Sequence, residues 1–157
     1  MSTTILTPAT APALYVVRDR IRFYGPVEGT DLKLVEVEVP PGSGSPPHRH
    51  ASPETFRILE GEVTFGIFEP GRPPEQVVTG PGAVVRVEAW AGHNYVNMGP
   101  TTARMLVILD DSMIGFFEDL GTEITPEAGP PSEAEIGAIM AACQKHGIEV
   151  LAGPPQT

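Results

Sequence analysis

The sequence has few of the features that mark secreted and membrane proteins. Cysteine occurs once in 157 residues, as Cys143, so no disulfide can form within the chain. The opening stretch, MSTTILTPATAPALYVV, lacks the basic segment and apolar core of a signal peptide. No apolar run approaches the roughly 18 residues that a membrane-spanning helix needs. We therefore expect a cytoplasmic protein with no membrane partner.

Basic residues are also scarce. The chain has 10 Lys and Arg against 20 Asp and Glu, which gives a formal net charge of -10 at pH 7. No segment gathers the basic residues into a patch that would bind phosphates. This charge pattern argues against nucleic acid as a partner.

What the chain does contain is the pattern of a single β-rich domain. Hydrophobic residues make up 41% of it and charged residues 19%, which is typical of a folded protein, and 18 prolines and 17 glycines supply many turns. Short apolar or alternating runs are separated by turn clusters such as PPGSGSPP and EPGRPPE. These runs predict strands at 14–25, 32–40, 54–61, 62–69, 75–80, 83–89, 93–99 and 103–110. About eight strands favour an all-β barrel or jelly roll, which leaves few exposed edges.

The last third of the chain changes character. It predicts a short helix over 112–121 and a longer one over 131–147, where Ser132 and Glu135 have the spacing of a capping box. Four apolar residues at helical spacing predict the packed face of the longer helix: Ile136, Ile139, Met140 and Cys143. We therefore divide the chain into an N-terminal arm (1–13), a β-barrel (14–111) and a helical extension that packs on the barrel (112–157).

Three histidines and a glutamate have the spacing of a metal site. His48 and His50 lie two apart, so in a strand both imidazoles point to one face. Glu54 begins the next predicted strand and His93 begins another. Three neutral imidazoles and a carboxylate suit one divalent transition metal, such as Fe, Mn, Ni, Cu, Co or Zn, with positions left for water, substrate or dioxygen. The alternative is a solvated polar loop.

These residues also carry a family resemblance. The first cupin motif, G(X)5HXH(X)3,4E(X)6G, is met by Gly42, His48, His50, Glu54 and Gly61. The second, G(X)5PXG(X)2H(X)3N, is met by Gly82, His93 and Asn97, but Glu88 replaces its proline and Trp90 its glycine. The chain thus resembles the cupin superfamily. The resemblance implies a double-stranded β-helix, a jelly-roll barrel, that binds a metal through the two histidine motifs, with Asn97 in a structural role.

A narrower likeness covers most of the chain. LVEVEVPPGSGSPPHRH, ETFRILEGEVTF, GFFEDLG and KHGIEVLAGPP resemble single-domain cupins of the quercetin 2,3-dioxygenase-like group. This resemblance implies a dioxygenase whose partners are O2 and a flavonol-type aromatic or enolic substrate. It also implies that Glu54 takes the substrate proton as general base. Because cupins are often homodimers, the resemblance further implies a homodimer.

Strand parity predicts an apolar pocket beside the metal. Phe56 and Ile58 share the face of Glu54, Val63, Phe65 and Ile67 form the inward set of the next strand, and Tyr95 shares the face of His93. We expect Phe56, Ile58, Phe65 and Tyr95 to line a pocket for a flat hydrophobic ligand. The same side chains would equally suit a filled barrel core.

The same residues are compatible with functions other than dioxygenation. A metal-dependent isomerase or hydrolase would use the same ligands with an additional acid or base, and a non-catalytic binding module would need no reaction at all. Trp90 suits a position at the cavity mouth or a packing role equally well. Strand parity does not settle whether Glu88 faces the metal site. His146 suits the end of a helix better than a metal, and Cys143 suits the packed face of that helix.

Overall fold

The protein folds as two antiparallel β-sheets with two helices against one of them. The computed structural model describes residues 1–151. The elements are β1 (Ala13–Val16), β2 (Asp19–Pro26), β3 (Leu32–Val39), β4 (His48–Arg49), β5 (Glu54–Glu60), β6 (Val63–Phe68), β7 (Glu75–Thr79), β8 (Val84–Val87), β9 (Gly92–Val96), β10 (Ala103–Asp110), α1 (Asp111–Leu120), α2 (Glu133–Lys145) and β11 (Glu149–Val150).

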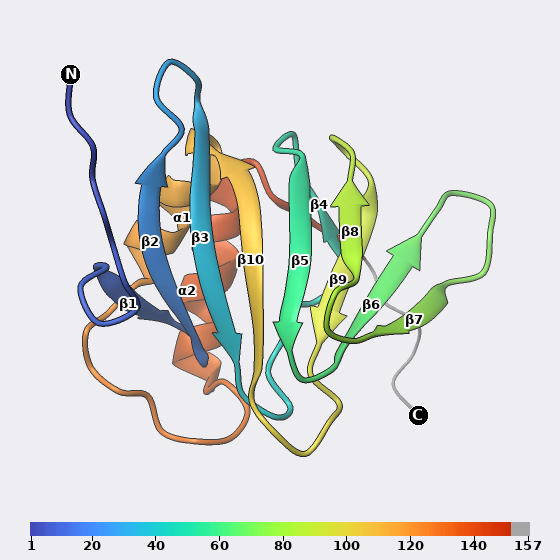
Figure 1. Cartoon of the computed structure of the whole chain (residues 1–157). Coiled ribbons are helices and arrows are strands. Elements are labelled where there is room, and N and C mark those ends of the chain that lie inside the picture. The colour runs from blue at the N-terminus through green and yellow to red at the C-terminus, as the bar shows by residue number, and fades with distance from the viewer. Residues whose placement is uncertain (152–157) are drawn as a thin grey trace.

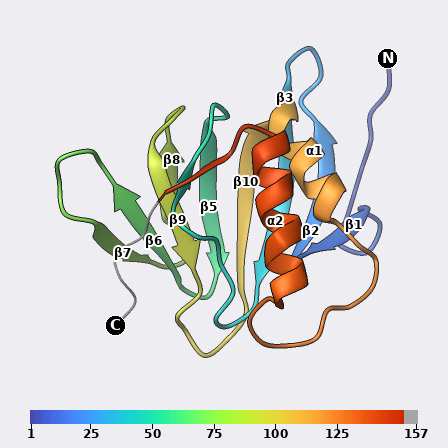
Figure 2. The same cartoon turned by 180° about the vertical axis from the view of Figure 1, so that it is seen from behind.

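The sheet order gives the expected jelly roll. One sheet has the order β1-β2-β3-β10-β5-β8 and the other β11-β4-β9-β6-β7 (Figure 1). Strands far apart in sequence pair inside each sheet, as β10 does with both β3 and β5. Seen from behind, α1 and α2 lie against the part of the first sheet that holds β2, β3 and β10 (Figure 2). The predicted all-β fold with a C-terminal helical part is confirmed.

The first predicted strand was wrong in one respect. The run 14–25 is two strands, β1 and β2, which pair with each other across a turn at Val17 and Arg18. Val17 has a φ of 59° there, a left-handed conformation that a β-branched residue rarely adopts. The turn lacks the glycine, asparagine or proline that would reveal it in the sequence.

Two very short strands were not predicted. His48 and Arg49 form β4, which pairs with β9 on one side through His48 and His93. On its other side β4 pairs with β11, where Arg49 binds Glu149 through Nε at 2.8 Å and a terminal nitrogen at 2.9 Å. The C-terminal segment thereby braces the strand that carries the first histidine.

The two helices lie close to their predicted positions. In α1 the Asp110 side chain accepts a hydrogen bond from the Ser112 backbone N–H, so the helix starts one residue earlier than expected. The capping box of Ser132 and Glu135 opens α2 as predicted. α1 contacts β1, β10 and α2. The boundaries proposed after residues 13 and 111 stay predictions, and 152–157 of the predicted extension lie outside the described residues.

The predicted apolar face of α2 is only half correct. Cys143 is buried in the core and Ile139 packs against it. Ile136 and Met140 are 49% and 47% exposed. The four positions span a wide arc of the helix, and the core covers only Ile139 and Cys143.

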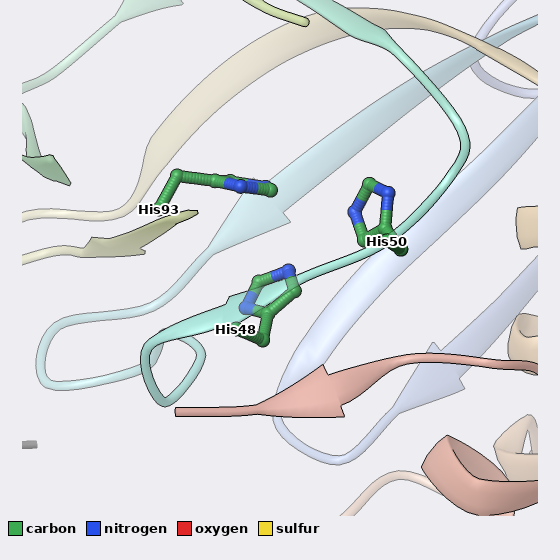
Figure 3. Close-up of side chains that lie close together, drawn as sticks. All are labelled: His48, His50 and His93. Atoms are coloured by element: carbon green, nitrogen blue, oxygen red, sulfur yellow. The ribbon is translucent and has the colours of Figure 1, made fainter. Parts of the chain in front are cut away.

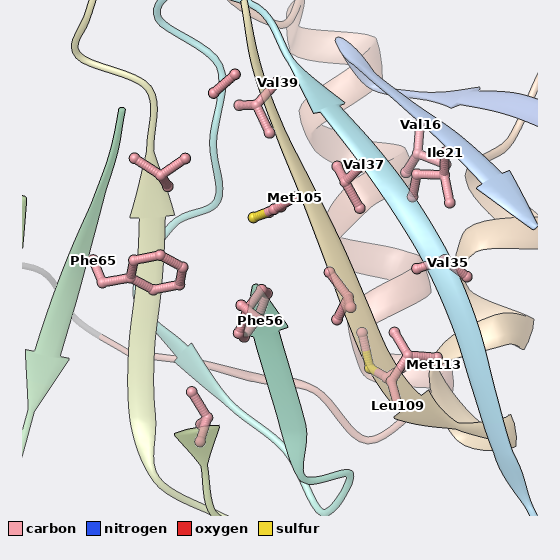
Figure 4. Close-up of a cluster of buried hydrophobic side chains, with 14 of the residues drawn as sticks. Val16, Ile21, Val35, Val37, Val39, Phe56, Phe65, Met105, Leu109 and Met113 are labelled. Atoms are coloured by element: carbon pink, nitrogen blue, oxygen red, sulfur yellow. The ribbon is translucent and has the colours of Figure 1, made fainter. Parts of the chain in front are cut away.

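The core fills the space between the sheets and beneath the helices. Val37, Met105 and Leu109 are almost fully buried on the first sheet (Figure 4). Phe56 meets Phe65 across the interior with ring centroids 5.1 Å apart (Figure 4). Ile67, predicted to face inward, is instead 37% exposed, close to the end of β6 where the hairpin with β7 extends away from the rest of the molecule (Figure 1).

The motif glycines lie at positions that need a left-handed backbone. Gly42, Gly61 and Gly82 have φ values of +82°, +76° and +92°. At Gly61 a Cβ would also lie 2.9 Å from Cα of Ala103. Their role in the cupin motif is therefore to permit the turns around the site. Among residues 1–151 no helix is long and apolar enough to cross a membrane.

Candidate metal centre

Three histidine side chains converge between β4 and β9. His48 lies in β4, His50 follows it in the loop to β5, and His93 lies in β9 (Figure 3). One nitrogen from each ring lies within 4.8 Å of the other two. The centroids of His48 and His93 are 4.4 Å apart, as expected from their direct pairing across the two strands.

Hydrogen bonds orient two of the imidazoles. Nδ1 of His48 lies 2.8 Å from the carbonyl oxygen of Pro46, and Nδ1 of His93 lies 2.9 Å from that of Ala91. A carbonyl oxygen only accepts, so each Nδ1 carries the proton and each Nε2 keeps its lone pair. This arrangement presents Nε2 as the metal-binding atom.

Burial lowers the pKa of two of these imidazoles, His48 and His50. Burial, with help from the neighbouring His93, lowers the pKa of His48 to about 4. The pKa of His50 is also lowered, first by burial and against the opposing effect of Glu54. Neutral imidazole is the form that binds metal ions, so protons compete little for these ligands near neutral pH.

Glu54 completes the cluster from the first residue of β5. Its carboxylate is buried, with one oxygen 3.5 Å from Nε2 of His50 and the other 3.4 Å from Nε2 of His93. Both ring nitrogens of His50 and Nε2 of His93 are buried without any hydrogen-bond partner among residues 1–151. Buried polar atoms left without a partner are costly, and a shared cation would satisfy them. The donor set therefore fits a divalent transition metal.

A cavity of about 180 Å³ opens beside the cluster. His48, Glu54 and His93 form one wall of it, whereas His50 is not among its lining residues. Apolar side chains from β2, β3, β10 and the helices form most of the rest. The centre thus faces a pocket with a largely apolar lining.

The four predicted pocket residues are divided between this cavity and the core. Phe56 and Tyr95 line the cavity, with ring centroids 6.3 Å apart. Ile58 and Phe65 are buried, at 0% and 3% exposure, but they do not line it. Strand parity identified the inward face of each strand but not how deep along the barrel the cavity extends.

Sequence reasoning missed a second polar group in this cavity. Asp19, the first residue of β2, is buried and lines the cavity. It accepts hydrogen bonds from Ser43 Oγ at 2.6 Å and from the Tyr95 hydroxyl at 2.5 Å. Burial raises the pKa of Asp19 to about 6, although both hydrogen bonds oppose the shift. The sequence placed this residue inside one long strand, so nothing marked it.

The remaining candidates lie outside the cavity or serve the fold. Asn97 is fully buried, and its amide donates to the backbone oxygens of Val39 and Thr101, both at 2.8 Å. Glu88 is exposed. His146 ends α2 and contacts Asp119 at 2.5 Å, away from the three clustered histidines.

Trp90 has a φ of 65°, which explains why the cupin motif has glycine at this position. Its side chain is 53% exposed, so packing recovers little of the strain. We predict that Trp90→Gly is about 1 kcal/mol more stable than Trp90→Ala, because both lose the indole but only glycine relieves the backbone. Equilibrium urea unfolding of the two variants measures this difference. Equal stabilities would show that the φ is unstrained.

Comparison with known proteins agrees with this architecture. Residues 35–109 match the family described as Cupin domain. The chain has the cupin fold. The matched region begins within β3, includes all three clustered histidines and ends in β10, so it contains the candidate metal centre. No curated protein matches the chain.

Solved structures with a similar fold are named for different reactions. The polyketide cyclase RemF from Streptomyces resistomycificus is 24% identical, with a TM-score of 0.57 over 69% of this chain and 80% of that one. A predicted oxalate decarboxylase from Thermotoga maritima is 19% identical, with a TM-score of 0.58 over 68% and 98%. A sugar phosphate isomerase from Silicibacter pomeroyi is 18% identical, with a TM-score of 0.58 over 68% and 75%. Such likeness establishes the fold, and the reaction has to be argued from the site.

Proposed function

We propose that this cupin is a metal-dependent dioxygenase that acts on a hydrophobic aromatic or enolic small molecule, with a quercetinase-like reaction. The observation that carries the proposal is the position of the imidazole and carboxylate cluster at the wall of an apolar cavity. His48, His50, Glu54 and His93 would hold one divalent ion per chain. When bound, that ion would lower the pKa of an enol or phenol oxygen and bring the substrate together with O2.

The chain's own residues have distinct tasks in this proposal. Phe56 and Tyr95 provide aromatic wall surface against which a flat substrate packs, and the other apolar lining residues exclude water. Glu54 lies on the cavity wall, so its carboxylate is placed to take the proton from the substrate oxygen. The substrate is thereby converted to the anion that reacts with dioxygen. The homodimer expected from the family resemblance stays a prediction.

One observation favours a second candidate, a metal-assisted isomerase. Such an enzyme needs an additional acid or base, and Asp19, with its pKa raised to about 6 by burial, supplies one in the same cavity. An isomerase consumes no oxygen. Oxygen consumption therefore distinguishes the two candidates.

Oxygen uptake tests the proposal. We expect metal-loaded protein to consume O2 with at least one compound from a panel of flavonols and smaller enols and phenols, in a molar ratio of one to the substrate lost. The panel is repeated with Fe, Mn, Ni, Cu and Co, because the donor set accepts all of them. Substrate loss without oxygen uptake would replace the dioxygenase by the isomerase, and no turnover with any pair would reject both.

A further inference from the structure

The cavity has two polar ends. At one end lie His48, His93 and Glu54, and at the other lies Asp19 at the start of β2. Tyr95 spans the distance between them. It follows His93 by two residues on β9, about 7 Å along the strand and on the same face, and its hydroxyl reaches Asp19. Between these ends the lining is predominantly apolar, with Phe56, Val107 and Met113 among its residues.

Asp19 retains hydrogen-bonding capacity toward the cavity. Each of its two oxygens accepts one hydrogen bond, from Ser43 and from Tyr95. A carboxylate has about four acceptor positions, so about two remain free. A buried carboxylate in an apolar cavity attracts a ligand group that donates a hydrogen bond, and it disfavours one that only accepts.

The volume of the cavity limits what can bridge its two ends. A cavity of about 150 Å³ accommodates benzene, whereas pockets for drug-sized ligands have about 300–1,000 Å³. At about 180 Å³ this cavity matches one ring with a few substituents. A three-ring flavonol exceeds that size.

We propose that Asp19 is a specificity-determining residue that binds a second hydroxyl group of the substrate, and that the substrate is a single-ring phenol or cyclic enol with two hydroxyl groups. One hydroxyl lies at the imidazole and Glu54 end, and the other donates to Asp19. This inference rests on the proposed small-molecule function of the cavity and narrows its substrate class.

Matched ligand pairs test the role of Asp19. The probes are catechol, resorcinol and hydroquinone, each paired with its monomethyl ether, titrated calorimetrically into protein loaded with Zn²⁺, which undergoes no redox chemistry. In the wild-type protein we expect at least one diphenol to bind about tenfold more tightly than its ether, because a hydrogen bond to a charged acceptor is lost in the ether. The same titrations in metal-free protein show whether the preference is independent of the ion.

Two variants separate Asp19 from its neighbours. Asp19→Asn preserves the size of the side chain and removes its charge, and we expect the preference for the diphenol to fall below about threefold. The methyl group adds the same bulk in both proteins, so the change in preference measures the hydrogen bond. Tyr95→Phe frees a further acceptor position on Asp19, and we expect the preference to persist.

The outcomes distinguish this inference from the proposed reaction. An unchanged preference in Asp19→Asn, or no preference in the wild-type protein, would overturn the role of Asp19. If the preference for the diphenol over its ether were lost in Tyr95→Phe but kept in Asp19→Asn, the role of Asp19 would also be overturned. The hydrogen bond to the second hydroxyl would then be assigned to the Tyr95 hydroxyl. A preference that depends on Asp19 without oxygen uptake would reject the dioxygenase and leave the role of Asp19 intact.

Discussion

Replacing His50 with alanine is expected to lower the affinity for the metal by at least about 100-fold, because even the residues behind metal ligands typically contribute 10–100-fold. His50 is buried, and neither of its ring nitrogens has a hydrogen-bond partner in the part of the chain that the structure describes, so both are available to a metal ion. Elemental analysis of wild-type and variant protein, both purified without added metal, measures the change. We expect a bound transition metal in the wild-type protein and almost none in His50→Ala.

His146→Ala is the matched control for this experiment. The sequence has four histidines, and His146 is the one outside the cluster, at the end of α2 in contact with Asp119. We expect the control to retain the wild-type metal content. Equal metal content in His50→Ala and wild-type protein would show that the three imidazoles do not form the site.

Replacing Glu54 with glutamine is expected to slow oxygen uptake by about 100-fold or more, which is the usual contribution of a general base. The amide has the size of the carboxylate but accepts no proton. Because His48, His50 and His93 remain, the variant should still bind metal, and the rate is therefore expressed per bound ion. Initial rates with a substrate found in the panel provide the measurement.

Glu60→Gln makes the same substitution at the other end of β5. Glu60 lies on the surface, where it binds Arg104 at 2.8 Å. Exposed ion pairs contribute little to stability, so this control should retain the wild-type rate within about twofold. A Glu54→Gln rate equal to that of the control would remove Glu54 from the chemistry and leave it as a ligand alone.

Strands in which apolar and polar residues alternate, and which end in clusters of turn-forming residues, were predictable, because both the alternation and the turn residues are local features of the sequence. β3, β5, β6 and β10 lie within one or two residues of their predicted bounds. The turn at Val17 was not predictable, since its conformation accompanies the distant contacts that Asp19 makes with Ser43 and Tyr95. A two-residue strand such as β4 or β11 carries no periodicity to detect.

The histidine cluster was predictable from spacing, whereas the shape of the cavity was not. His48 and His50 lie two apart, Glu54 and His93 begin predicted strands, and all four fit the cupin motifs. They could therefore be grouped from the sequence, although His50 lies in the loop after β4. Cavity depth depends on how the two sheets and the helices pack. Ile58 and Phe65 therefore lie in the core, and Asp19 faces the cavity from a strand end that the sequence did not reveal.

The pairing of β4 with β11 has a consequence for the order in which the protein folds. Arg49 and Glu149 are 100 residues apart, so the strand that carries His48 gains its outer neighbour only after residue 149 has been synthesised. β9 can pair with β4 much earlier. Closing so long a loop is entropically costly and slow. We therefore expect the pairing of β4 with β9 to form before the pairing of β4 with β11.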